Sequence, residues 1–243
     1  RATVDGAAGL LSATGIRFLN GEGMTITEFP RDLENLKTID KSGLDRRLRS
    51  CKIIVLCDVK NNLLGDTGAV KCFGPQKGAS EKDVLILEKC MARLSEVASL
   101  SVGSDMASIK YGGAAGGVAA GVSAFLNGQL VNGIEFFLDE IDFDKELENA
   151  DLVITAEGSL DAQTFEGKGP YGVAVRAKRR KVPVIALAGK ISFPSFDETN
   201  DLFDAILSIG HGPSTEEESI RNTATDLMRS ACQLGNILAL RQT

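Results

Sequence analysis

The sequence holds very little histidine and no tryptophan. Its one histidine among 243 residues, His211, is the only residue around which a Ser-His-Asp or Cys-His site could be built. The five cysteines are an odd number and form no Cys-x-x-Cys pair, which argues for reduced, mostly buried thiols and against a disulfide framework or a zinc cluster. An aromatic share of only 5% beside 26 glycines indicates tight turns and backbone-lined loops more than a stacking surface for sugars or bases.

Long apolar runs and an excess of positive charge are also absent. No stretch approaches the roughly 18 apolar residues that cross a bilayer, and no basic-then-apolar signal segment opens the chain. A net charge of −6 excludes a domain that binds duplexes by broad phosphate neutralisation. We therefore expect a cytoplasmic protein, a monomer or homodimer, that binds neither nucleic acid nor a membrane.

The second half of the chain has the pattern of an open α/β fold. Three short apolar runs, at 151–156, 182–188 and 203–209, read as strands that are buried on both faces in a parallel sheet. Residues 172–180 have helical spacing and a basic last turn, and Ser214 or Thr215 can cap a helix that runs to about Leu240. This order predicts part of a doubly wound, Rossmann-like parallel sheet.

The first half holds one similar strand and one clear helix. The strand is expected over 52–59, and the helix over 81–100, where Ser80 and Asp83 form the start of a capping box. The glycine-rich stretch 112–117 leads into a helix of small residues that continues to about Leu126. We place two α/β domains at 1–112 and 113–243.

Polar residues follow two of the expected strands, where ligands bind in open α/β sheets. The stretch 57–80 carries a carboxylate, an amide, a lysine and a glycine that could contact a ligand: Asp58, Asn62, Lys77 and Gly78. The stretch 157–170 repeats the carboxylate, amide and lysine set: Glu157, Asp161, Gln163, Thr164 and Lys168. The alternative is a pair of solvated loops closed by Asx turns.

Such residues suit phosphoryl transfer, which depends on positioning and charge stabilisation and needs no histidine. Gly112 and Gly113 open a candidate phosphate cradle, because glycine lets the backbone approach an anion in front of a helix N-terminus. The stretch matches neither the P-loop pattern nor a dinucleotide fingerprint after a clean strand. Close packing of a small-residue helix is the other explanation.

Several segments together resemble the glycerate kinase family (type 1). The similar blocks are T-V-D-G-A-A-G-L-L (3–11), N-N-L-L-G (61–65), F-G-P-Q-K-G-A (73–79), G-A-A-G-G-V-A-A-G (113–121) and E-G-S-L-D-A-Q-T-F-E-G-K (157–168). The resemblance runs over nearly the whole chain in the right order. It implies ATP- and Mg²⁺-dependent phosphorylation of D-glycerate, with 2-phosphoglycerate favoured over 3-phosphoglycerate, in a cleft between two α/β domains.

The resemblance also implies roles for individual residues. Asp161 is the first choice for the catalytic carboxylate near the glycerate hydroxyl or Mg²⁺, with Asp58 the second catalytic candidate and Glu157 a second metal ligand. Asp5 is a further contact, and Lys77 and Lys168 would pair with phosphate or the glycerate carboxylate. Their alternatives are an Asx turn for Asp161 and ordinary surface positions for the lysines. Asn62, Gly78, Gln163 and Thr164 complete the substrate- or phosphate-binding set.

The chain departs from the family pattern at four places. Val4 replaces an Asn, Ala7 a Gly and Ala156 a Gly, and Asn62 stands where a Pro is usual. Arg1 opens the sequence where such proteins are already well under way, so we expect the chain to be about the C-terminal two-thirds of one. These departures keep two alternatives open: a non-catalytic or regulatory binding protein, and a kinase for another small hydroxy acid.

Overall fold

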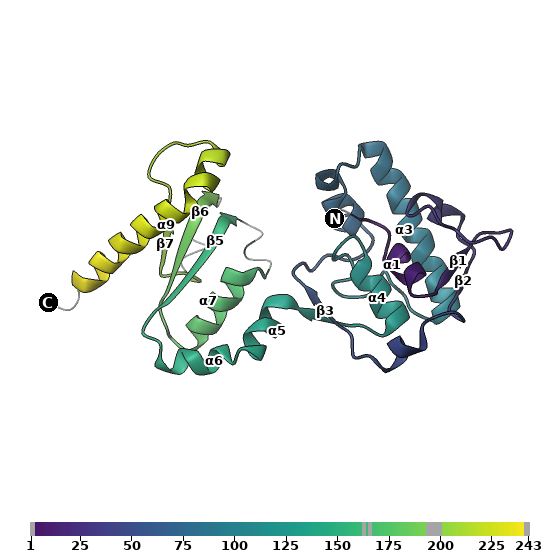
Figure 1. The fold of residues 1–243 in the computed structure, drawn as a ribbon, viewed down its shortest axis with the longest axis horizontal. Helices are drawn as coiled ribbons and strands as arrows, with labels where there is room; N and C mark the ends of the chain where they lie inside the picture. The colour runs from purple at the N-terminus through teal and green to yellow at the C-terminus, as the bar shows by residue number, and fades with distance from the viewer. Residues whose placement is uncertain (1–2, 162–163, 165–166, 193–200, 241–243) are drawn as a thin grey trace. The chain divides into compact units, whose positions relative to one another are not determined.

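The computed structural model describes residues 3–161, 164, 167–192 and 201–240. The chain forms two compact units, Arg1–Gly133 and Ile134–Thr243, drawn purple to teal and teal to yellow in Figure 1. The boundary therefore lies after Gly133 and not at the expected 112/113. The reason is that the glycine-rich stretch packs on residues of the first unit, and the strand that follows it pairs with the strand at 54–57.

The described residues of unit 1 form four helices and two small sheets. Its helices are α1 (Ala8–Ala13), α2 (Ala69–Phe73), α3 (Glu81–Val102) and α4 (Val118–Leu126). An antiparallel pair joins β1 (Arg17–Leu19) to β2 (Thr38–Asp40), and a parallel pair joins β3 (Ile54–Cys57) to β4 (Gln129–Asn132). Short 3-10 helices connect them: η1 (Arg31–Asn35), η2 (Arg46–Ser50) and η3 (Pro75–Lys77).

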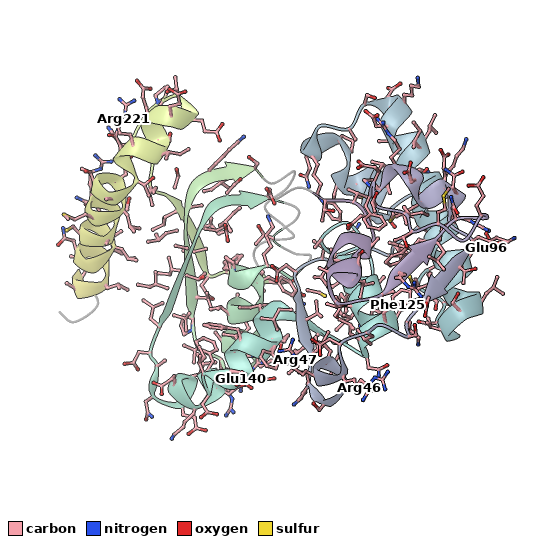
Figure 2. All side chains as sticks on the ribbon, turned by 45° about the vertical axis from the view of Figure 1, so that its right-hand side comes forward. Arg46, Arg47, Glu96, Phe125, Glu140 and Arg221 are labelled. Atoms are coloured by element: carbon pink, nitrogen blue, oxygen red, sulfur yellow. The ribbon has the colours of Figure 1, made fainter. Side chains whose placement is uncertain are left out.

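Helix α3 organises the core of unit 1. The predicted helix and its capping box are confirmed: Ser80 caps α3, and its side chain and that of Asp83 each accept the other residue's backbone N–H. The buried face of α3 carries Met91, Leu94 and Val97, spaced for one side of a helix. This face packs in one cluster with Phe18 and with Phe125 of α4, which lies among the side chains that fill unit 1 (Figure 2).

In unit 2, the residues that the structure describes form a three-stranded parallel sheet with helices on both faces. The strands, in spatial order, are β5 (Val153–Asp161), β6 (Val184–Ser192) and β7 (Ala205–Ser208). The helices are α5 (Gly133–Glu140), which starts at the unit boundary, α6 (Phe143–Glu146), α7 (Gly169–Arg179) and α9 (Glu216–Ala239), with the 3-10 helix η4 (Leu147–Asn149) before β5. The predicted mixed α/β class with a parallel sheet is confirmed.

Alternate residues of β6 face the two helices. Ala186 and its neighbours two positions away pack with Ala174 and Ala177 of α7, whereas Ile185 and Leu187 pack with the cluster that holds Leu234 of α9. Figure 1 shows α7 and α9 on opposite sides of the three strands. A continuous apolar run is therefore required in β6, because both of its faces are covered. Among the described residues, no helix has the length and apolar character needed to span a membrane.

Arg176 of α7 ties this helix to α5 and α6. Its guanidinium is almost fully buried and pairs with Glu135 at 2.8 Å, Asp139 at 2.6 Å and Asp144 at 2.9 Å. Burial alone would lower the pKa of Arg176, but the hydrogen bonds to Glu135 and Asp139 outweigh it and raise the pKa. The basic last turn, which the sequence suggested as a helix C-terminus, therefore also provides the buried arginine that forms these ion pairs.

Strand β5 is longer than the sequence indicates. It was expected to end before Glu157, with Glu157 and Asp161 in a following loop, yet both lie within β5. The partner strand explains this, because β6 also continues past Gly189 and pairs Glu157 with Ala188 and Asp161 with Ser192. Glycines that usually mark a strand end are here accommodated inside two extended, paired strands.

Candidate functional site

Three of the segments that carry the family resemblance meet in unit 1. A Cβ on Gly113 would lie 2.3 Å from the backbone oxygen of Asn62, and one on Gly116 would lie 2.0 Å from the backbone oxygen of Thr3. A Cβ on Gly121 would lie 2.1 Å from the oxygen of Gly6. The glycines of 113–121 thus allow the chain to pack directly on the backbone of 3–6 and 61–63.

The N–H groups at the start of this glycine-rich stretch are already used. Gly112 donates to the oxygen of Ile109 at 2.9 Å, and Gly113 donates to the oxygen of Asn61 at 2.9 Å. A phosphate cradle needs N–H groups that point at the anion and have no other acceptor. The structure therefore favours close packing for Gly112 and Gly113, the alternative that the sequence left open.

Lys77 ends η3 and reaches the segment at Thr3. Its Nζ donates to the backbone oxygen of Thr3 at 2.7 Å, and burial lowers the pKa of Lys77 while nearby Asp5 partly opposes the shift. Lys77 also lines a cavity of about 690 Å³, which we name the Lys77 cavity. It is lined by Thr3, Val4, Phe29, Pro30, Arg31, Glu34, Gly74, Lys77, Gly78, Ala79, Asp83, Ile86 and Leu87.

Asp5 has a structural task at the start of α1. Its carboxylate is buried and accepts the N–H of Ala7 at 3.2 Å and that of Gly9 at 3.0 Å. Ala7 has φ 69°, in the left-handed region that favours glycine, which gives a physical reason for the glycine that the resemblance leads us to expect at this position.

Asp58 and Asn62 lie outside the lining of the Lys77 cavity. Asp58 is exposed just after β3, and its Oδ1 lies 2.5 Å from where a Cβ on Gly133 would stand. Asn62 is exposed too, and its backbone oxygen accepts the N–H of Ala69 at 3.0 Å. Of the candidates in the first half of the chain, Lys77 and Gly78 thus line the cavity, whereas Asp58 and Asn62 do not.

In unit 2, three predicted residues gather at the end of β5. Asp161 Oδ1 lies 4.0 Å from Lys168 Nζ, with both side chains about one-third exposed. The N–H of Asp161 donates to Oγ1 of the fully buried Thr164 at 3.1 Å. Gln163 lies outside the described residues. We name Asp161, Thr164 and Lys168 the β5-end cluster.

The strand geometry separates the two proposed metal ligands. Glu157 and Asp161 are four residues apart on one side of β5, and at ~3.3 Å per residue their backbones stand about 13 Å apart. One ion cannot bind both carboxylates at that spacing. In the part of the chain that the structure describes, no group of three or more His, Cys, Asp or Glu side chains could hold a metal ion.

His211 takes no part in either site. It is exposed, and its Nδ1 lies 2.7 Å from Nη2 of Arg229 and 3.4 Å from Oδ1 of Asp226 on α9. Sequence reasoning missed Phe29, Arg31 and Glu34, which line the Lys77 cavity. No motif marks these three, and Arg31 and Glu34 reach the cavity through the packing of η1 against α3.

Comparisons with known proteins agree with the motif resemblance. The model of the glycerate kinase family matches residues 1–239. A glycerate kinase of Bacillus cereus is 44% identical over 90% of this chain and 58% of its own length, and the glycerate 2-kinase of Escherichia coli is 37% identical over 98% of this chain and 63% of its own. A crystal structure described as glycerate kinase 2 from Salmonella typhimurium LT2 superposes with a TM-score of 0.78 at 39% identity, over 99% of this chain and 63% of that one.

These matches cover nearly all of this chain, but the chain spans only about three-fifths of the relatives' length. The family match does not support the expected placement as the C-terminal two-thirds of such a protein. A family model that matches almost every residue, together with such relatives, is decisive for the family itself: this chain belongs to the glycerate kinase family.

Proposed function

We propose that residues 1–243 form part of a glycerate kinase that transfers the terminal phosphoryl group of ATP to D-glycerate. The observation that carries this proposal is the family match over residues 1–239, which includes every segment of the candidate sites. The curated relatives with 36–44% identity are named glycerate kinase or glycerate 2-kinase. The name of the Escherichia coli relative favours the 2-hydroxyl as acceptor and 2-phosphoglycerate as product.

In this proposal the β5-end cluster serves the phosphoryl transfer. Asp161 accepts the proton of the attacking hydroxyl as the new oxygen–phosphorus bond forms and the bond between the γ-phosphorus and the β-phosphate oxygen breaks. Lys168, whose Nζ lies 4.0 Å from Asp161, offsets the negative charge of the phosphates. The first turn of α7 follows directly at Gly169, and its positive end also favours an anion.

The described residues fit one mode of Mg²⁺ binding. Mg²⁺ is commonly held by one or two carboxylates together with substrate phosphates and water, and it needs no cage made entirely of protein ligands. Asp161 alone could supply the protein ligand, whereas Glu157 stands too far along β5 to share the ion. When bound, the ion would neutralise phosphate charge, and Asp161 would orient it.

The test is nucleotide turnover with a panel of acids. A full-length protein containing these residues is assayed for ADP release with ATP and Mg²⁺, in the presence of D-glycerate, L-glycerate, lactate or tartronate. We expect release only with D-glycerate and only with the metal, and NMR of the product should show the phosphate on the 2-oxygen. Turnover restricted to another hydroxy acid would reassign the substrate, and no turnover with any acid would contradict the kinase proposal.

A further inference from the structure

Arg176 lies where three helices of unit 2 meet. Its side chain is only 8% exposed. It pairs with Glu135 and Asp139 of α5 and with Asp144 of α6, and it also donates to the backbone oxygen of Glu135 at 3.1 Å. Figure 1 shows α7 beside α5 and α6. Because the donors of a guanidinium lie in one rigid plane, these bonds define the position of α7 relative to both helices.

The apolar contacts of α7 define its position less sharply. Ala174 and Ala177 of α7 are fully buried in the cluster that also holds Ala186 and Ala188 of β6. Apolar burial is non-directional, so such small side chains hold the helix close to the sheet without fixing its place along the sheet. A buried ion pair is often no more stabilising than apolar side chains of similar volume. The contribution of Arg176 is therefore direction more than stability.

Lys168 is attached to the start of α7. It is the N-cap residue of this helix, and its backbone oxygen accepts the N–H of Gly172 at 3.2 Å. The first turn of α7 also packs directly on α5, because a Cβ on Gly172 would lie 2.6 Å from Cγ1 of Ile134. A shift of α7 along α5 would therefore move Lys168 with it.

Asp161 is attached to the other partner of Arg176. Helix α6 continues through η4 into β5, whose last residue is Asp161. Arg176 thus links the helix that follows Lys168 to the segment that leads into the strand of Asp161. The 4.0 Å between Asp161 Oδ1 and Lys168 Nζ joins a strand to a helix, so it is kept only while α7 keeps its place.

We propose that Arg176 is a positioning residue for phosphoryl transfer, which holds Lys168 at its working distance from Asp161. Arg176 acts through α7 and its pairs to α5 and α6, and all of these groups lie within unit 2. This inference rests on the proposed function, because it takes Asp161 and Lys168 as members of the reacting site. A displacement of about 1 Å in a positioned group can lower the rate by about 10²-fold, so the effect is measurable.

The first experiment measures the position of Lys168 without catalysis. The 243-residue chain is treated with a trace of acetic anhydride, and mass spectrometry compares acetylation of Lys168 with that of the exposed Lys82 on α3. In Arg176→Gln, Lys168 should react about threefold faster or more relative to Lys82, because a larger share of molecules holds its side chain away from Asp161. Arg176→Lys keeps the charge but not the planar fork, and it should restore only part of the difference.

The second experiment is a double-mutant cycle in the full-length protein. Arg176→Gln should lower kcat by about 10–100-fold and change KM for ATP little, since a misplaced Lys168 fails mainly in the transition state. In the Lys168→Met background the same substitution should change kcat by less than about threefold, because the group that Arg176 positions is already absent. A purely structural residue would lower the melting temperature and change kcat equally in both backgrounds.

Lys178→Gln is the matched control. Lys178 lies two residues after Arg176 on α7, and its Nζ pairs with Asp204 at 2.8 Å, so this variant also loses an ion pair of the helix while the pairs to α5 and α6 stay. It should leave the acetylation of Lys168 and kcat unchanged. Asp144→Asn removes only the α6 partner, and it should shift both measurements in the same direction if Arg176→Gln does not fold. Circular dichroism and melting temperatures identify the folded variants.

The possible outcomes separate this inference from the proposed function. Unchanged acetylation of Lys168 in the folded Arg176→Gln and Asp144→Asn variants overturns the inference, even if the full-length protein phosphorylates D-glycerate. An equal loss of kcat with and without Lys168 also overturns it. Faster acetylation of Lys168 supports the positioning by Arg176, and it does so even if no acid is phosphorylated, in which case only the proposed function fails.

Discussion

The folded chain partly buries the charged side chain of Lys77 and so removes part of its hydration. Because burial lowers the pKa of Lys77, the protonated side chain is less favourable in the folded chain than in the unfolded one. This opposition to folding is fully present below the lowered pKa and disappears as the pH rises toward the ordinary lysine value.

Asp161→Asn is the sharpest test of the β5-end cluster. The amide keeps the shape but can neither accept the hydroxyl proton nor offer a charged ligand, so kcat of the full-length protein should fall by about 10²–10⁴-fold while KM for ATP changes little. Asp151→Asn, at an exposed position two residues before β5, is the control and should leave kcat unchanged. Steady-state kinetics decide. A kcat within threefold of the unchanged protein would make Asp161 a structural residue.

Asp204 should make the stability of unit 2 depend on pH. The hydrogen bond from Lys178, aided by the Val184 N–H at 2.7 Å and opposed by burial, lowers the pKa of Asp204. Its contribution to stability is therefore complete above the ordinary pKa of about 4 and is lost as the pH falls through the lowered value. We expect Asp204→Ala to lower the Tm of unit 2 by about 4 °C at pH 7, the shift that ~1 kcal/mol produces in a unit of this size.

The Tm difference between Asp204→Ala and the unchanged chain should narrow as the pH falls below about 4. Asp201→Ala changes an exposed aspartate of the same segment that has no partner among the described residues, and it should show no such gap. Calorimetric scans at several pH values give the comparison. A Tm difference that stays constant below pH 4 would mean that the charge of Asp204 does not contribute to the stability of the folded chain.

For single residues, the sequence indicates which side chains could take part in catalysis or binding, but it does not indicate which side chains lie near one another. Lys77 and Asp161 stand out because a lysine and a carboxylate follow predicted strands in glycine-punctuated segments. Arg31 could not be found this way, since its place in the lining of the cavity that also holds Lys77 depends on packing between segments 46 residues apart in the chain. Glu157 was assigned with Asp161 because the strand was expected to end early, and only strand pairing with β6 reveals their separation.

Among the elements, helices with strong terminal signals are the most predictable. The caps of α3 and α9 follow from Ser80 and Thr215 with an acidic residue three positions later, and both capping boxes form. Strand β4 was not predicted, because its four residues carry no apolar run and are in a strand only through pairing with β3. Local chemistry therefore fixes these helices, whereas β4 and the end of β5 depend on tertiary pairing.

Two helical glycines should respond in opposite ways to the same substitution. A Cβ on Gly121 of α4 would lie 2.1 Å from Gly6 O and 2.7 Å from Ala7 Cβ, whereas one on Gly235 of α9 meets nothing within 4 Å. Gly121→Ala should destabilise the chain by about 2–3 kcal/mol through the forced shift of backbone. Gly235→Ala should stabilise it by about 1 kcal/mol through helix propensity. Urea titrations measure both, and equal effects would contradict the close packing of α4.

For the whole molecule, the division into units follows from where apolar side chains can be buried. The large cluster of unit 1 combines α1, α3, α4 and the η1 segment, and the clusters of unit 2 lie on the two faces of its sheet. The glycine-rich stretch falls at the start of the second domain in the expected division at 112/113, whereas the structure divides the chain after Gly133. It belongs to unit 1 because its missing side chains let it pack against residues 3–6.

Because each unit has its own hydrophobic core, we expect the two units to unfold in separate transitions. Leu94 is fully buried in unit 1 and Phe203 is buried in unit 2, each within a cluster confined to its own unit. Truncation to alanine costs about 2–5 kcal/mol for a buried leucine and 3–5 for a phenylalanine. Calorimetry of the chain should show two transitions, with Leu94→Ala lowering one by at least about 4 °C and Phe203→Ala lowering only the other. A single transition that both substitutions shift equally would show that the two cores unfold as one cooperative structure.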